Sequence, residues 1–94
     1  MLLPSRTAVL NELYGEKELN VNQIMDRLKP IYGSESQFNK KLYVEHIMAL
    51  EANGLVELTS YEVDEKDELV CFYRMTQEGR STVDKYVDKK YRKA

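Results

Sequence analysis

The chain contains very little cysteine or histidine, with one residue of each among its 94. Cys71 has no second cysteine for an intramolecular disulfide or a redox pair, and its apolar neighbours predict a thiol buried in the core. His46 lies in a predicted helix with no ligand set beside it in the sequence, which disfavours both a metal site and acid–base catalysis. Because Gly-rich phosphate loops and nucleophile motifs are also missing from the sequence, we expect neither an enzyme nor a cofactor.

Long apolar runs are missing too, and the N-terminal Met-Leu-Leu-Pro lacks the basic region and apolar stretch of a signal peptide. These absences predict a cytoplasmic protein without a membrane segment. A composition of 43% hydrophobic and 32% charged residues is typical of a folded globular chain. A length of 94 residues predicts one domain over 1–94 with a modest core, to which a homodimer would add burial.

Two helices are predicted in the first third of the chain. The first follows Pro4 with Ser5 as its cap and ends at Gly15. A short extended segment at 19–22 comes next, and either of its two asparagines can cap the second helix. We expect the second helix to end near Lys29, because the residue before a proline is pushed out of the helical region.

A third, longer helix is predicted over about 36–53. Ser34–Gln37 has the spacing of a capping box at its start, and Gly54 supplies the left-handed residue that ends it. One apolar stripe along this helix predicts the face that packs on the core, and further apolar side chains lie to one side of it. The stripe is Tyr43, Ile47 and Leu50, and the additional side chains are Leu42, Val44 and Met48.

A hairpin and a last helix complete the predicted order. From Leu55 the apolar residues alternate, as they do again over 69–75, with a polar turn at 62–68 between the two runs. Thr76 is expected to cap a final helix that carries basic residues at its far end, as the helix dipole favours. Its apolar side predicts a contact with a dimer mate or another partner through Val83, Tyr86, Val87 and Tyr91.

The predicted order of helix, short strand, two helices, hairpin and helix resembles the winged helix-turn-helix, in particular bacterial MarR-like and PadR-like regulators. Leu50–Val56 is similar to the end of their recognition helix and the first wing strand, and Tyr73–Arg80 to the second wing strand and the following helix. The resemblance implies a mainly α, α+β fold of three helices, a two-stranded β-hairpin wing and a C-terminal helix. It also implies a dimeric transcriptional regulator that binds double-stranded DNA.

On this resemblance, the N-terminal half of the third helix reads the major groove. Amide side chains there suit base edges, and lysines there suit phosphates. Serines of the preceding connector add phosphate contacts, and the wing adds one lysine. The implied DNA contacts are Ser36, Gln37, Asn39, Lys40, Lys41 and Lys66.

The charge of the wing disagrees with this function. The net charge is −2, and residues 62–68 hold five acidic side chains beside Lys66. Phosphate repels such a tip, so we interpret it as a solvated turn that stays clear of DNA or as a surface for a basic protein partner. The alternative function is therefore a protein-interaction module, such as a mobile-element factor or an assembly subunit, that uses this turn and the surplus apolar side chains of the third helix.

Overall fold

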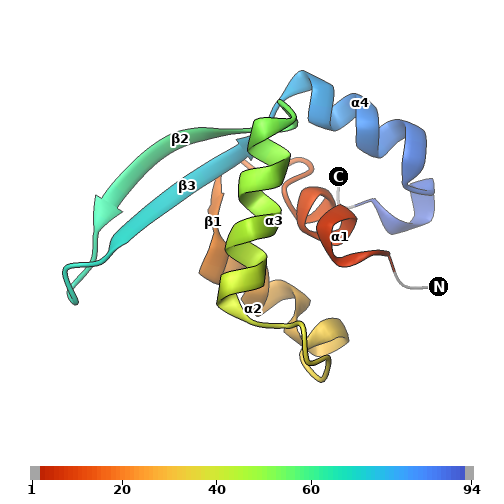
Figure 1. The fold of residues 1–94 in the computed structure, drawn as a ribbon. Helices are drawn as coiled ribbons and strands as arrows, with labels where there is room; N and C mark the ends of the chain where they lie inside the picture. The colour runs from red at the N-terminus through yellow and green to blue at the C-terminus, as the bar shows by residue number, and fades with distance from the viewer. Residues whose placement is uncertain (1–2, 93–94) are drawn as a thin grey trace.

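The computed structural model describes residues 3–92 and orders them as helix, strand, two helices, two strands and two further helical segments (Figure 1). The elements are α1 (Ser5–Glu12), β1 (Leu19–Asn20), α2 (Val21–Tyr32), α3 (Lys40–Ala52), β2 (Val56–Val63), β3 (Leu69–Met75), α4 (Gln77–Tyr86) and the 3-10 turn η1 (Lys89–Tyr91). The predicted mixed α+β fold is confirmed.

The sheet of the described chain has three antiparallel strands in the order β1-β3-β2, one more than the expected two-stranded hairpin, because the extended segment predicted at 19–22 pairs with the hairpin over Leu19–Asn20. β2 and β3 form the predicted hairpin, in which Val63 lies opposite Leu69. β1 joins the other edge of β3, with Leu19 opposite Tyr73. Both of these side chains are buried, so the third strand brings two apolar groups into the core and satisfies backbone groups that would otherwise lie at a sheet edge.

Helix α3 lies at the centre of the molecule, packed against α1, α2 and the start of β2 (Figure 1). The hairpin projects to one side of it, and α4 lies on the opposite side, against α1. The predicted stripe of α3, formed by Tyr43, Ile47 and Leu50, is buried in this core. The stripe therefore fixes which face of α3 is turned away from solvent.

Helix α1 differs from the prediction at both ends and α2 at one. α1 ends at Glu12, and turn residues lead from there to the predicted stop at Gly15. Within the described residues, α1 starts after Pro4 without a side-chain cap, so Ser5 is its first residue and not its cap. Asn20 caps α2 as predicted, but the helix continues through Pro30 to Tyr32. Tyr32 is buried, and its hydroxyl donates a hydrogen bond of 2.6 Å to the carbonyl of Leu3. Burial of this ring favours three more helical residues than predicted, despite the proline.

Helix α3 begins four residues later than expected. The side chain of Asn39 caps it by accepting a hydrogen bond from the backbone N–H of Leu42, at 2.9 Å. Residues 34–38 form turns, and Phe38 packs edge-on against Tyr43 with 5.0 Å between ring centroids. This packing favours the Asn39 cap over the predicted capping box. The other end is as predicted, because Gly54 has φ +75°.

The predicted final helix is shorter than expected at its C-terminal end. Thr76 caps α4 as predicted, by accepting a hydrogen bond from the N–H of Gly79 at 3.1 Å. The helix ends at Tyr86, because Val87 is extended and buried in the core. Arg92 then folds back, and its guanidinium donates hydrogen bonds to the carbonyls of Val87 and Asp84. Because Val87 is buried, the basic C-terminal segment leaves the axis of α4 after Tyr86.

Candidate nucleic-acid interface

The outward face of α3 combines two lysines with apolar side chains. Lys40 and Lys41 are exposed in its first turn. Farther along the helix, Val44 is half-buried, Glu45 is exposed and Met48 is 57% exposed. The two lysines can contact DNA phosphates at the first turn of α3, whereas the middle of its outward face is apolar or acidic.

Three of the implied DNA contacts precede α3. Ser36 and Gln37 are exposed in the turns before it, and Asn39 is its cap. The carbonyl oxygen of the Asn39 side chain already accepts the N–H of Leu42, so the amide is not available for two-point recognition of a base edge. The expectation that Gln37 and Asn39 lie on the helix face was therefore wrong, because the helix starts at Lys40.

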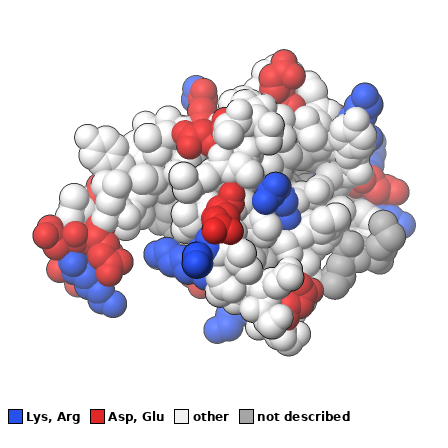
Figure 2. All heavy atoms as spheres, in the orientation of Figure 1, with Lys and Arg blue, Asp and Glu red and all other residues white. Residues whose placement is uncertain are grey.

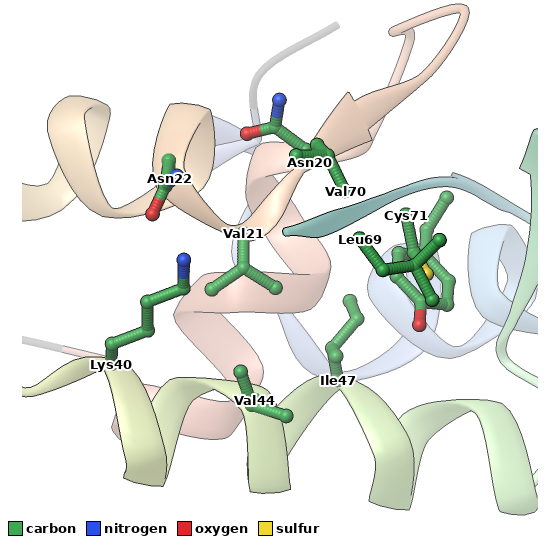
Figure 3. Close-up of a pocket in the computed structure, with 10 residues that line it drawn as sticks. Asn20, Val21, Asn22, Lys40, Val44, Ile47, Leu69, Val70 and Cys71 are labelled. Carbon is green, nitrogen blue, oxygen red and sulfur yellow. The ribbon is translucent and has the colours of Figure 1, made fainter. Parts of the chain in front are cut away.

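A pocket of about 150 Å³ lies where the start of α2, the first half of α3 and the start of β3 meet (Figure 3). Its polar edge is formed by Asn20, Asn22 and Lys40. The Lys40 side chain extends from α3 toward the start of α2, where Asn22 lies. The apolar wall consists of Val21, Val44, Ile47, Leu69, Val70, Cys71 and Tyr73.

Sequence reasoning missed Asn20 and Asn22 as neighbours of Lys40. No local motif marks them, because they approach α3 only through the packing of α2 against it. Cys71, predicted to be a buried core thiol, is half-buried and lines this pocket. The polar edge of the pocket extends the surface around Lys40 and Lys41 beyond α3 itself.

The tip of the hairpin is an ordered acidic turn. A side-chain oxygen of Asp64 accepts hydrogen bonds from the backbone N–H groups of Lys66 and Glu68, each at 2.9 Å. Asp67 adopts φ 62°, which closes the turn. Acidic side chains gather at this tip, whereas both signs of charge are scattered over the face around α3 (Figure 2). The turn between β2 and β3, which holds Lys66 among carboxylates, therefore lies away from the first turn of α3, which holds Lys40 and Lys41 (Figure 1).

The four side chains expected at a dimer or partner contact divide into two kinds. Val83 and Val87 belong to the chain's own core, so their assignment to a surface contact was wrong. Tyr86 is 69% exposed and Tyr91 is exposed as well. The ammonium groups of Lys85 and Lys90 lie over these two rings, 5.3 and 5.2 Å from their centroids. The accessible part of this end is thus aromatic and basic.

His46 has protein partners on α1 and α3. Its Nδ1 accepts a hydrogen bond of 3.2 Å from Arg6, and its ring packs edge-on against Tyr43. Burial, followed by the positive charge of Arg6, lowers the pKa of His46. Residues 3–92 contain no group of three or more His, Cys, Asp or Glu side chains placed to hold a metal ion. Over the same residues, no helix has the length and apolar character needed to cross a membrane.

Models of known protein families give no match to this chain, and neither do curated protein sequences.

Proposed function

We propose that this chain is a winged-helix domain that binds duplex DNA through α3, as a small transcriptional regulator does. The order of helices and strands and the sheet order β1-β3-β2 support the winged-helix assignment. The observation that carries the DNA-binding function is the exposed pair Lys40 and Lys41 in the first turn of α3. Asn22 of α2 lines the same pocket as Lys40. Lysines at such a position neutralise phosphates, and an amide offers a further hydrogen bond.

The predicted contact is small. α3 has 13 residues and is about 20 Å long, so it can lie across the major groove. The acidic hairpin tip adds repulsion where a wing would otherwise contact the backbone. The domain without its tip is mildly basic, because removing residues 62–68 from the 14 basic and 16 acidic side chains leaves 13 and 11. We therefore expect weak binding that depends on salt through a few phosphate contacts.

The test is fluorescence anisotropy with a labelled duplex of mixed sequence at about 50 mM salt, where phosphate contacts are strong. Lys40→Ala and Lys41→Ala should each weaken binding roughly tenfold and reduce the salt slope by about 0.9. Lys17→Ala is the matched control, since it removes one exposed positive charge from the segment between α1 and β1, outside the pocket and the hairpin. Absence of binding by the unmodified chain, or equal losses in all three variants, would refute the proposal.

A second candidate function, a protein-interaction module, is supported by the hairpin. Its tip is acidic, and large apolar side chains along it are exposed, among them Tyr61 at 68%. Exposed apolar patches commonly mark a protein contact. Capture of a protein by the unmodified chain, lost when Tyr61 becomes serine while duplex binding persists, would favour this candidate.

A further inference from the structure

The hairpin carries an apolar face that the domain leaves uncovered. Among residues 3–92, eight large hydrophobic side chains are exposed, and four of them lie on β2 and β3. The strand register places these four on the same face as buried Tyr73, because Leu58 pairs with Tyr73 and Val63 with Leu69. This face thus continues past the core into solvent. We call Leu58, Tyr61, Val63 and Leu69 the hairpin strip.

The hairpin strip leads into the pocket described above. Leu69 belongs to both, and Val44 and Ile47 of α3 close the pocket on the other side (Figure 3). An apolar cavity of about 150 Å³ holds a benzene molecule, so this pocket has room for one aromatic ring. A buried aromatic anchor beside an apolar contact is a common arrangement at protein interfaces.

The charge around the hairpin strip determines which side chains can lie next to an aromatic ring bound in the pocket. The tip between Val63 and Leu69 carries four acidic side chains and one lysine, and Glu62 adds a fifth acidic side chain just before Val63. Binding there requires basic side chains on either side of the aromatic residue, since acidic ones would be repelled. The ligand is therefore a segment in which an exposed aromatic residue lies among lysines.

This chain presents such a segment at its other end. Tyr86 is 69% exposed and is followed by the exposed Lys89 and Lys90, and the segment 85–92 carries four basic side chains against the single carboxylate of Asp88. Tyr91 and Lys85 add a second ring and a further positive charge. The hairpin and this segment lie on opposite sides of the molecule (Figure 1), so one copy cannot place its own segment on its own hairpin strip.

We propose that the hairpin strip and its pocket take the segment 85–92 of a second copy of this chain, with the Tyr86 ring in the pocket and Lys89 and Lys90 near the acidic tip. Two copies related by a twofold axis and lying in opposite directions make this contact twice, which gives a closed dimer. The association does not depend on DNA binding. Because Lys40 borders the same pocket, duplex DNA and the second copy compete for this surface.

The experiment measures the mass of the full chain in solution by sedimentation equilibrium at low salt. The tip variant Glu62→Lys, Glu65→Lys and Glu68→Lys reverses exposed charges and keeps Asp64, whose side chain holds the turn. The end variant is Lys89→Glu and Lys90→Glu. A control with Lys17→Glu and Lys29→Glu makes the same change in net charge as the end variant, outside both surfaces.

We expect the unmodified chain and the control to be dimers, and the tip and end variants to be monomers when alone. Mixed together, these two variants should form a heterodimer, because every tip then faces an end of opposite charge. Tyr86→Ala should weaken the dimer at least tenfold. Circular dichroism of each variant verifies its fold.

Three results would overturn the proposal. The first is an unmodified chain that stays monomeric. This result counts against the proposal even if the chain binds a peptide that contains lysine and tyrosine. The second is a dimer that the tip and end variants preserve, since another face then holds it. The third is a mixture of the two variants that stays monomeric. Loss of duplex binding in Lys40→Ala with an intact dimer leaves the proposal standing and concerns only the DNA-binding function.

Discussion

Replacement of Gly79 by alanine tests the fold most sharply, because helix propensity and tertiary structure predict opposite signs. Gly79 lies in the first turn of α4. Propensity alone predicts that Gly79→Ala stabilises the protein by about 1 kcal/mol, since alanine restricts the unfolded chain and favours the helix. The structure predicts a loss of stability.

The predicted loss comes from the contact between α4 and the segment that precedes β2. A Cβ at position 79 would lie 2.1 Å from the carbonyl oxygen of Leu55 and 2.8 Å from Cγ of Met75. The same oxygen accepts a hydrogen bond from the N–H of Thr76, at 3.0 Å, so moving it disturbs the start of α4. Overpacking costs about 1–3 kcal/mol and the hydrogen bond contributes about 1 kcal/mol. After the gain in propensity, we expect a net loss of about 2 kcal/mol.

Thermal unfolding followed by circular dichroism measures this loss. For a domain of this size, about 2 kcal/mol corresponds to a fall in Tm of roughly 8–16 °C. Gly54→Ala is the matched control: a Cβ there meets no atom within 4 Å, but φ is +75°, so only the left-handed conformation costs energy, about 1 kcal/mol. A Gly79→Ala protein as stable as the parent would refute the close approach of α4 to Leu55.

Three further changes have defined outcomes. Tyr32→Phe removes the hydrogen bond to the carbonyl of Leu3 and should lower the free energy of unfolding in urea by about 1 kcal/mol; an unchanged midpoint would contradict the continuation of α2 past Pro30. Val83→Ala should cost about 2 kcal/mol at every protein concentration, whereas a loss that vanishes on dilution would indicate a dimer contact. The lowered pKa of His46 gives stability that is present above pH 6.5 and is lost as the pH falls below it, since the unfolded chain then binds more protons. His46→Asn should flatten this part of the curve of stability against pH, and an equally steep curve in the variant would show that other groups cause it.

The sequence by itself determined features that depend on neighbouring residues. The periodicity of Tyr43, Ile47 and Leu50 identified the buried face of α3, Gly54 its end, and Thr76 the start of α4. The alternation over 69–75 identified a strand of the hairpin. Caps, turns and periodicity act over a few residues, so they can be recognised without knowledge of the fold.

Only the tertiary structure decided which of several local signals prevailed. Because Tyr32 is buried, α2 continues beyond Pro30, where the sequence predicts its end. Because Val87 is buried in an extended conformation, α4 ends before the predicted C-terminal basic residues. Packing also brought Asn22 beside Lys40 and added β1 to the sheet. The energy of a cap or a proline is comparable to that of burying one side chain, so the choice depends on what the rest of the chain places against that side chain. The sequence shows which residues can end each helix or form each surface. Packing between distant segments determines which of these residues do so.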